Sequence, residues 1–531
     1  KTFVANQFAA SLAGAPPSYL VKRGYVQLTV DARGTGNSEG SWGAFSPTEN
    51  RDAGKIVEWA HSSTRPWSNG NVGMSGPSYM GISQIFAAGN QPAGLKAIFP
   101  QVPGADVYRD IVASGGQLDV GFMPLWLGLV TATGLAPPAY AATSPASALK
   151  SVAEHLTGLA TFTLPLLLDA AAGGDAAYDG KFFADRSAIN VVPKVNVPTF
   201  FIGGEYDLFQ RGTPLLFENL RKRGVPTKMI IGPWDHLQGS SGKDVGKAGY
   251  GSLGDLQLRW FDKYLKGAKD TSLDSDIPPM TYFEQGSGDW RKAKDWIGPN
   301  LKAASYKLSG KSSTGGAAGN LTTGSVADGT SDVLPIPVAG FCTRSASQWT
   351  AGVMNLLPIK NPCLANNAIN DKAGVVFDTA PMTSAVSIQG PINAHLYASS
   401  IGGDGMLSVA VEDVSPSGTV SRLTGGWQVI SLRAVDQAKS RYLDGKLIQP
   451  YHPFTKASRK QLTTGEVAPV DVEVFPTGAQ IKKGHKLRIS IQAFDVPHLL
   501  PNLSLAPGTL TVISIYNSAK YPSELTIPTV R

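Results

Sequence analysis

A short apolar strand that runs into a glycine-flanked turn and then a helix is the feature that most constrains this chain. Residues 72–74 predict the strand, and the small and apolar residues at 79–88 predict the helix. Ser78 stands at the turn, with Gly76 before it and Gly81 after it. A residue in a strained backbone conformation crowds its neighbours, so small residues must flank it. The layout is typical of a nucleophile elbow, which projects a serine hydroxyl from a sheet, although a Gly-x-Ser pair can also mark a plain turn.

Alternating strands and helices surround this turn. Residues 25–30 and 95–99 predict strands, and residues 51–61 predict an amphipathic helix. This alternation indicates a parallel sheet whose functional loops lie at the carboxyl ends of the strands. The same pattern returns later in the chain. The expected fold class is therefore α/β, with a first part at residues 1–108 and a second part at residues 196–268.

Residues 109–195 differ in character, because alanine and leucine dominate and apolar residues recur at helical spacing. In an α/β-hydrolase this is the place of a helical cap over the catalytic serine. Most of its apolar residues are expected to be core. We expect Phe122 and Trp126 to line the substrate pocket, together with Trp234 from a later loop.

Short strands of period two, separated by turn signals, fill residues 277–531 after a polar linker at 269–276. This pattern is typical of a β-sandwich, and we expect a C-terminal jelly roll. Residues 280–283 are its first predicted strand. The Gly-, Ser- and Thr-rich residues 309–331 predict a mobile loop.

A serine nucleophile needs a base within hydrogen-bond reach and a carboxylate that orients the base. Of the seven histidines, only His236 stands on a loop directly after a predicted strand of the α/β region. The same test leaves Glu205, Asp207 and Asp235 as carboxylates. Asp235 adjoins the histidine, so backbone geometry is expected to turn its side chain away. The order Ser78, Asp207, His236 is the order that α/β-hydrolases use.

The chain resembles the family of cocaine esterase, α-amino-acid ester hydrolases and X-prolyl dipeptidyl peptidases. The family's Gly-x-Ser-Tyr-x-Gly motif matches residues 76–81 position for position. Four further stretches carry the resemblance, at residues 31–40, 203–207, 232–236 and 475–485, with Trp290 and Trp296 in a W-x5-W stretch. The resemblance covers essentially the whole chain. It implies the catalytic set Ser78, Asp207 and His236, and we interpret residues 31–40 as a structural loop beside the site.

Acyl transfer also needs donors that stabilise the developing alkoxide. The backbone N–H of Tyr79 supplies one. The resemblance implies a second donor, a tyrosine hydroxyl that stands shortly before a Gly-Lys or Asp-Lys pair in the family's motif. Lys1-Thr2 is similar to the end of that motif. We therefore expect this tyrosine and the first strands of the sheet in a segment ahead of Lys1, either continuous with the chain or cleaved and still associated.

Composition excludes several classes of partner. The net charge of +7 is spread along the chain, and its densest cluster, residues 221–223, ends a predicted helix where cations are favoured, so we expect no nucleic-acid partner. The most apolar run, residues 122–135, is broken by Pro124 and Gly128, so we expect no membrane span. No zinc or other metal site and no cofactor is expected. The oligomeric state is not readable from the sequence.

Two cysteines, Cys342 and Cys363, stand 21 residues apart without a nearby histidine. One disulfide that closes a loop fits this spacing and indicates an oxidising compartment, and two unrelated buried thiols are the alternative. With the bacterial resemblance, the disulfide favours a secreted or cell-envelope protein.

The function expected is that of a serine hydrolase that cleaves carboxylic esters or amides through an acyl-enzyme. An X-prolyl dipeptidyl peptidase or an α-amino-acid ester hydrolase must hold a substrate ammonium. The cap carboxylates form no tight cluster in the sequence, which favours an uncharged acyl group; they are Asp110, Asp119, Glu154, Asp169, Asp175 and Asp179. A non-catalytic carbohydrate-binding protein is the alternative of another class.

Overall fold

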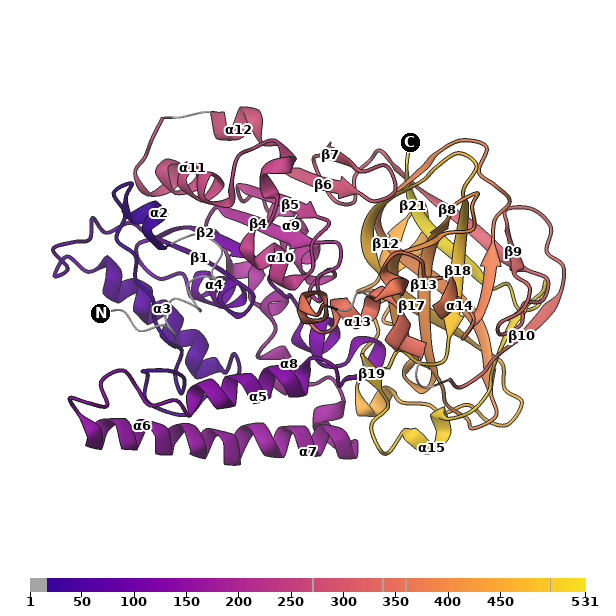
Figure 1. The fold of residues 1–531 in the computed structure, drawn as a ribbon, viewed down its shortest axis with the longest axis horizontal. Coiled ribbons are helices and arrows are strands. Elements are labelled where there is room, and N and C mark those ends of the chain that lie inside the picture. Colours follow the sequence, from indigo (N-terminus) through magenta and orange to yellow (C-terminus); the bar gives the residue numbers. More distant parts are fainter. Residues whose placement is uncertain (1–16, 270–271, 337–338, 359–360, 497) are drawn as a thin grey trace.

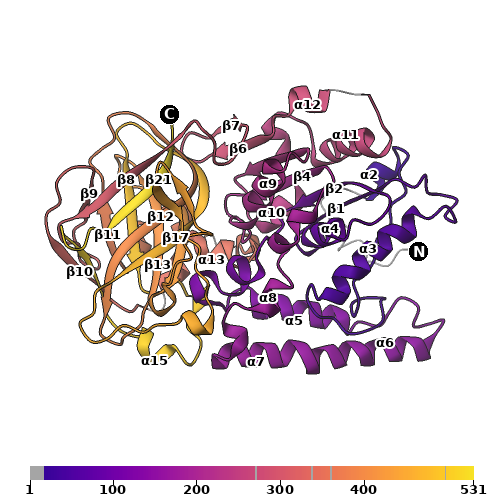
Figure 2. The ribbon, with the colours of Figure 1, turned by 180° about the vertical axis from the view of Figure 1, so that it is seen from behind.

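The fold is described by a computed structural model that places residues 17–269, 272–336, 339–358, 361–496 and 498–531. An α/β body lies on one side of the molecule and a strand-rich body on the other (Figure 1). A layer of helices runs along one edge of the α/β body, and the view from behind shows the same division (Figure 2).

A six-stranded sheet forms the centre of the α/β body, in the order β1-β2-β4-β5-β6-β7. The strands are β1 (Val72–Pro77), β2 (Leu95–Gln101), β4 (Thr199–Gly204), β5 (Thr227–Gly232), β6 (Met280–Glu284) and β7 (Asp289–Ala293). The first five are parallel, and β7 is antiparallel to β6. The carboxyl ends of β1, β4 and β5 therefore meet at one edge of the sheet.

Strand β6 corrects one sequence prediction. Residues 280–283 were expected in the C-terminal sandwich, but β6 pairs with β5, with Met229 opposite Met280. A period of two identifies a strand and says nothing about which sheet the strand joins. The α/β sheet thus extends to β7.

Helices cover both faces of the sheet, namely α3 (Pro47–His61), α4 (Tyr79–Gly89), α9 (Gly212–Lys222), α10 (His236–Ser241) and α11 (Leu253–Leu265). Successive strand residues point to opposite faces. Phe200 accordingly belongs to the core cluster that contains Trp260 of α11. Its neighbour Phe201 belongs to the larger cluster that contains Ile85 of α4 and Phe217 of α9.

The predicted strand at residues 25–30 is not formed. The segment follows the short helix α2 (Pro17–Val21) and pairs with no described strand. Val26, Leu28 and Val30 are exposed. Tyr25 holds the segment to α11, because its hydroxyl donates to Asp262 over 2.7 Å. Without a partner ladder, an apolar alternation alone does not make a strand.

The insertion between β2 and β4 is mainly helical. Its principal helices are α5 (Met123–Gly134), α6 (Pro145–Gly158), α7 (Leu164–Ala172) and α8 (Lys181–Ala184), and a π-helical turn, Leu159–Thr163, joins α6 to α7. Helices α5, α6 and α7 form the layer along the edge of the α/β body (Figure 1). A two-stranded pairing of β3 (Leu118–Asp119) with β19 (Leu499–Leu500) ties this insertion to the strand-rich body.

One helical run within this insertion, Pro145–Ala172, is long and apolar enough by its 28 residues and composition to cross a membrane. Only 17% of its most apolar window is buried within the molecule. The same run supplies Phe162 and Leu166 to the pocket described below. The run is continuous because the π-helical turn bridges two shorter helices, and that continuity was not foreseen from the sequence.

The strand-rich body is organised around an eleven-stranded sheet. Its strands are β8 (Leu301–Ser309), β9 (Gly319–Thr322), β10 (Gly329–Val333), β11 (Val375–Asp378), β12 (Val386–Ser400), β13 (Met406–Val414), β14 (Val420–Val429), β17 (Ala468–Ile481), β18 (Lys486–Gln492), β20 (Ile513–Asn517) and β21 (Glu524–Val530). The long strand β12 pairs with β17, β20 and β21, so it joins several parts of the sheet.

The composition of residues 309–331 predicted a mobile loop, but the segment is not a loop throughout. It contains β9 and the start of β10, and Leu321 is buried. Gly319 allows β9 to approach the core, because a Cβ there would come within 2.4 Å of the Phe377 ring. Its glycines thus serve packing as well as turns.

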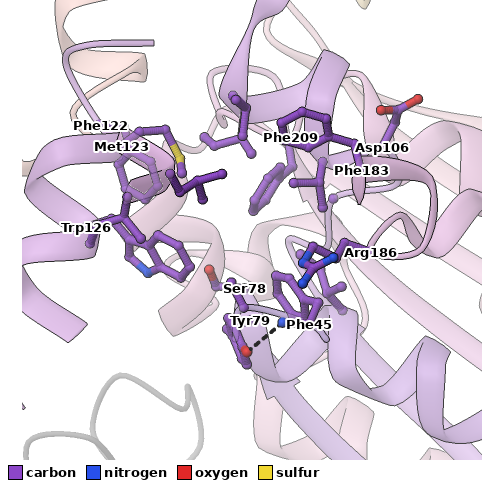
Figure 3. A pocket seen from close by; sticks show the side chains of 18 of the residues that line it. Phe45, Ser78, Tyr79, Asp106, Phe122, Met123, Trp126, Phe183, Arg186 and Phe209 are labelled. Carbon is purple, nitrogen blue, oxygen red and sulfur yellow. Dashed lines mark hydrogen bonds between the residues drawn. The ribbon is translucent and has the colours of Figure 1, made fainter. Parts of the chain in front are cut away.

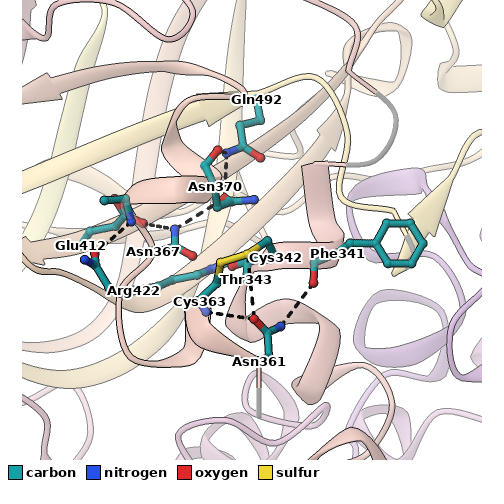
Figure 4. The surroundings of a disulfide bond; sticks show 12 residues. Phe341, Cys342, Thr343, Asn361, Cys363, Asn367, Asn370, Glu412, Arg422 and Gln492 are labelled. Atoms are coloured by element: carbon teal, nitrogen blue, oxygen red, sulfur yellow. Dashed lines mark hydrogen bonds between the residues drawn. A yellow bond between two sulfur atoms is a disulfide. The ribbon is translucent and has the colours of Figure 1, made fainter. Parts of the chain in front are cut away.

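Cys342 and Cys363 form a disulfide, which confirms the predicted pairing (Figure 4). The side chain of Asn361 links the two arms, accepting from the Cys363 N–H over 2.9 Å and donating to the Phe341 carbonyl over 3.2 Å. The short helix α13 (Arg344–Gln348) begins two residues after Cys342, with Thr343 as its N-cap. The disulfide therefore anchors a segment that reaches the candidate active site.

Replacing both cysteines by alanine should lower the stability of the strand-rich body. A closed loop of this length contributes roughly 3 kcal/mol, and the midpoint of denaturant unfolding should fall accordingly. The unreduced wild-type protein, once denatured, should show no free thiol in a thiol titration. Two titratable thiols in that sample would contradict the disulfide and the location inferred from it.

Candidate active site

The turn between β1 and α4 holds Ser78 in a strained conformation. Its φ is 56° and its ψ is −123°, outside the regions that residues other than glycine usually occupy. A Cβ at Gly76 would lie 2.8 Å from the Met80 Cβ, and one at Gly81 would lie 2.8 Å from the Gln101 carbonyl oxygen. Both glycines are thus required by space, which is the physical basis of the sequence pattern.

His236 and Asp207 lie beside Ser78, as Asp207 follows β4 and His236 follows β5. The His236 Nδ1–H donates to Asp207 Oδ1 over 2.6 Å, and His236 Nε2 lies 2.8 Å from Ser78 Oγ. Asp207 is fully buried, and His236 is 5% exposed. This geometry allows the imidazole to take the serine proton while the carboxylate fixes its tautomer and orientation.

Two residues that sequence reasoning missed hold this arrangement. The Gln348 side chain, from α13 of the strand-rich body, donates to the Asp207 backbone carbonyl over 2.8 Å. The Phe209 ring packs edge-on against His236, with centroids 5.5 Å apart. No sequence signal marked Gln348, because it belongs to the other body and lies 141 positions further along the chain.

Asp235 has a different role from that of its neighbour. It is the N-cap of α10, and its side chain accepts from the Gln238 N–H over 2.9 Å. Its second oxygen accepts from the Asn355 side chain over 2.7 Å. These bonds turn the carboxylate away from the imidazole.

Glu205, the third candidate carboxylate, connects the two bodies. It is buried and accepts hydrogen bonds from the Gly478 N–H over 3.0 Å and the Thr477 hydroxyl over 2.9 Å. Burial raises the pKa of Glu205 to about 8, against the lowering effect of these bonds. The side chain is thus a structural link and does not contact the histidine.

Replacing Glu205 by glutamine should flatten the pH dependence of stability. The folded pKa is raised above the ordinary 4.5, so the folded state binds a proton that the unfolded state has released. Wild-type stability should therefore fall from about pH 4.5 to pH 8, by at most about 1.4 kcal/mol per pH unit from this group. Denaturant midpoints at several pH values test this, and parallel curves for the two proteins would contradict it.

A candidate oxyanion donor, the Tyr79 N–H, lies next to the serine. Tyr79 is the first residue of α4, and the first N–H groups of a helix have no carbonyl partner within it. The Tyr79 hydroxyl is used elsewhere: it donates to Glu49 and accepts from the Phe45 N–H and the Trp42 indole N–H, each over 3.1 Å. The second donor was expected ahead of Lys1, and Lys1-Thr2 lie outside the described residues.

The loop at residues 31–40 closes on itself and on the cap. The Asp31 carboxylate accepts from the Asn37 backbone N–H over 2.9 Å and from its side chain over 2.8 Å. The Gly40 N–H donates to Glu154 of α6. These contacts fit a structural loop.

A narrow pocket with a volume of about 70 Å³ lies in front of Ser78 (Figure 3). Its walls are almost entirely aromatic and aliphatic. The lining residues beside Ser78 and Tyr79 are Ala44, Phe45, Ile82, Gly104, Asp106, Val107, Ile111, Val112, Phe122, Met123, Trp126, Leu127, Phe162, Leu166, Phe182, Phe183, Arg186 and Phe209.

Phe122 and Trp126, which were expected in the pocket, are among these residues. Trp234 is not, which corrects the sequence expectation. It is buried in the core cluster on the far face of the sheet and packs against Trp290, with centroids 5.9 Å apart. Its indole folds back over Gly232, where a Cβ would lie 2.4 Å from the ring.

The carboxylates of the cap are engaged outside this pocket. Asp110 pairs with Arg211, Asp179 with Arg109, and Asp175 with Lys456. Asp119 accepts from the backbone at the start of α5, and burial raises its pKa well above the ordinary value. Among the described residues, no group of three or more His, Cys, Asp or Glu side chains is arranged to hold a metal ion.

Comparison with known proteins places this geometry in context. A family model described as X-Pro dipeptidyl-peptidase (S15 family) matches residues 3–238, and one described as X-Pro dipeptidyl-peptidase C-terminal non-catalytic domain matches residues 275–526. A putative serine esterase of Mycobacterium bovis is 26% identical over 96% of this chain and 84% of its own length. Cocaine esterase of Rhodococcus sp. is 24% identical over 96% of this chain and 89% of its own length. A solved structure of an α-amino acid ester hydrolase superposes with a TM-score of 0.71 at 20% identity, over 97% of this chain and 87% of that one, and supports the fold.

Proposed function

Because the chain belongs to the X-Pro dipeptidyl-peptidase (S15) family of hydrolases, we propose that it is a serine esterase with Ser78 as nucleophile, His236 as general base and Asp207 as orienting acid. The observation that carries this proposal is the continuous hydrogen-bond chain from Ser78 through His236 to a buried Asp207. These three residues follow three separate strands, and Ser78 among them lines the apolar pocket.

The mechanism follows from these positions. His236 Nε2 takes the proton of Ser78 Oγ as that oxygen bonds to the ester carbonyl carbon. The oxyanion that forms is stabilised by the Tyr79 N–H. The imidazolium then gives its proton to the departing alkoxide, which leaves the acyl group on Ser78. Water, deprotonated by the same imidazole, hydrolyses this acyl-enzyme and restores the serine.

The charge at the pocket favours an ester without a substrate ammonium. An aminoacyl ester or an X-prolyl peptide would place its ammonium beside the Arg186 guanidinium, and like charges repel. The only carboxylate among the lining residues, Asp106, is already paired with Arg109 over 2.8 Å. Peptidase and amino-acid ester hydrolase activity remain the alternatives, because the matching family model is named for X-Pro dipeptidyl peptidases.

The test is a panel of p-nitrophenyl esters and aminoacyl-proline p-nitroanilides. We expect p-nitrophenyl acetate and longer acyl esters to be hydrolysed, with little release from the anilides. Faster cleavage of the anilides would favour the peptidase. No hydrolysis of any member would favour the other class, a carbohydrate-binding protein with an inactive hydrolase body.

Two finer points belong to the same proposal. The strand-rich body is proposed to be a jelly roll, supported by the way β12 joins β17, β20 and β21. A secreted or cell-envelope location is proposed from the disulfide and from relatives in bacteria.

A further inference from the structure

Arg186 is an unusual residue in this pocket. It follows α8, and Figure 3 shows its guanidinium directed from one wall toward the centre, with Trp126 on the opposite wall. The guanidinium stacks on the Phe182 ring at 3.8 Å and lies 5.8 Å from the Phe162 ring. Two aromatic rings thus hold a cation in place in the pocket that Ser78 lines, where Asp106 is the only other charged lining residue.

Arg186 forms no ion pair with any residue that the structure describes. Among the described residues, none of its nitrogens lies within 4.0 Å of a carboxylate oxygen. Its two hydrogen bonds go to neutral acceptors, from Nε to the Gly43 carbonyl over 3.4 Å and from Nη1 to the Phe182 carbonyl over 3.0 Å. Nη2 has no hydrogen-bond partner among the described residues, so one edge of the guanidinium is available.

The surroundings leave this charge poorly compensated. Burial lowers the pKa of Arg186, and the more distant Asp185 and Glu49 offset this only in part. Glu49 is itself occupied by the Tyr79 hydroxyl. The other charged lining residue, Asp106, is paired with Arg109. In the neighbouring pocket, Lys181 pairs with Asp185 and Lys456 with Asp175, whereas Arg186 has no such ion pair within the described part of the chain.

We propose that Arg186 binds a carboxylate of the substrate, so that the preferred substrates are otherwise apolar esters or amides that carry a second, ionised carboxyl group. This inference rests on the proposed esterase function and names its substrate class. A guanidinium binds a carboxylate through two parallel hydrogen bonds, and such bonds strengthen where water is excluded. The apolar walls would pack against the carbon chain between the carboxylate and the scissile carbonyl. The carboxylate can stand on the acyl part or on the leaving part of the substrate.

The kinetic test compares substrates that differ only in this charge. For the acyl part, the pair is the p-nitrophenyl hemiester of adipic acid and its terminal carboxamide. For the leaving part, the pair is 4-acetoxybenzoate and 4-acetoxybenzamide. We expect wild type to favour the anion of one pair in kcat/KM, and Arg186→Met to reduce that preference by about 10- to 100-fold. The loss should lie mainly in KM. Arg186→Lys should retain part of the preference, because the lysine ammonium keeps the positive charge but cannot form the two parallel hydrogen bonds of a guanidinium.

The controls separate binding from folding. Arg65→Met is the matched control, because Arg65 also stacks on an aromatic ring, Trp59 at 4.1 Å, but does not line the pocket. It should leave the preference unchanged. An unchanged melting temperature would show that Arg186→Met is folded. Equal kcat/KM for both members of both pairs in wild type, or a preference that Arg186→Met leaves intact, would overturn the proposal.

A binding measurement keeps this inference distinct from the esterase proposal. Calorimetry on the Ser78→Ala protein with monoethyl adipate should show binding that Ser78→Ala/Arg186→Met lacks, and monoethyl adipamate should bind neither. If no ester is hydrolysed but this difference is found, the esterase proposal fails and the carboxylate site stands. If esters are hydrolysed, and neither this difference nor a preference for 4-acetoxybenzoate over 4-acetoxybenzamide is found, Arg186 serves only to hold the cap loop against Phe182.

Discussion

Replacing Ser78 by alanine should lower kcat for ester hydrolysis by about 10⁴- to 10⁶-fold, as removal of a serine nucleophile does in comparable triads. The oxygen that bonds to the substrate would be gone, while the pocket and the Tyr79 N–H would remain. The residual rate should therefore exceed that in water, and KM should change little. Steady-state kinetics with a p-nitrophenyl ester measure both quantities.

Ser83→Ala is the matched control for this change. Ser83 stands on the same helix, and its hydroxyl donates to the Tyr79 carbonyl over 2.8 Å, away from the imidazole. Its removal should cost less than tenfold in kcat. A fluorophosphonate should label wild type and Ser83→Ala on Ser78, and should not label Ser78→Ala. An adduct found by mass spectrometry on another residue would show that a different nucleophile is used.

The elbow and the two loops that meet it could be predicted because local sequence determines them. Gly76 and Gly81 are required because a Cβ at these positions would clash with Met80 and with the Gln101 carbonyl, respectively. The glycine pattern around Ser78 therefore has a steric cause. Likewise, the ends of parallel strands share an edge whatever the intervening chain does. The juxtaposition of Ser78, Asp207 and His236 could therefore be expected from their places after three strands.

Features set by distant parts of the chain could not be predicted in this way. β6 was assigned to the wrong sheet because alternation carries no information about its partner. Trp234 follows the correct strand, yet its indole turns onto Gly232 and into the core. Arg186 was not singled out, because it becomes a pocket residue only through the packing of Phe162 and Phe182 around it. Gln348 reaches Asp207 from the other body.

Replacing Asp207 by asparagine should lower kcat by about 10⁴-fold, because an amide in this position favours the wrong imidazole tautomer. Asp207 Oδ1 accepts the Nδ1–H of His236 over 2.6 Å, and in the proposed mechanism it stabilises the imidazolium that forms during acyl transfer. The neutral amide loses that stabilisation as well. The melting temperature should change little, since the two side chains have nearly the same shape.

The adjacent substitution, Asp235→Asn, provides the sharpest comparison, because it makes the same chemical change one residue from the histidine. Asparagine is as good an N-cap as aspartate, so the bond from the Gln238 N–H to this side chain should survive. The contact with Asn355 would weaken, but it lies on the side away from the imidazole. We expect kcat to stay within about tenfold of wild type, which leaves a difference of about 10³-fold between the two variants. If Asp235→Asn were the more damaging change, Asp235 would be the orienting acid in solution, and Asp207 would serve only to hold the loop after β4.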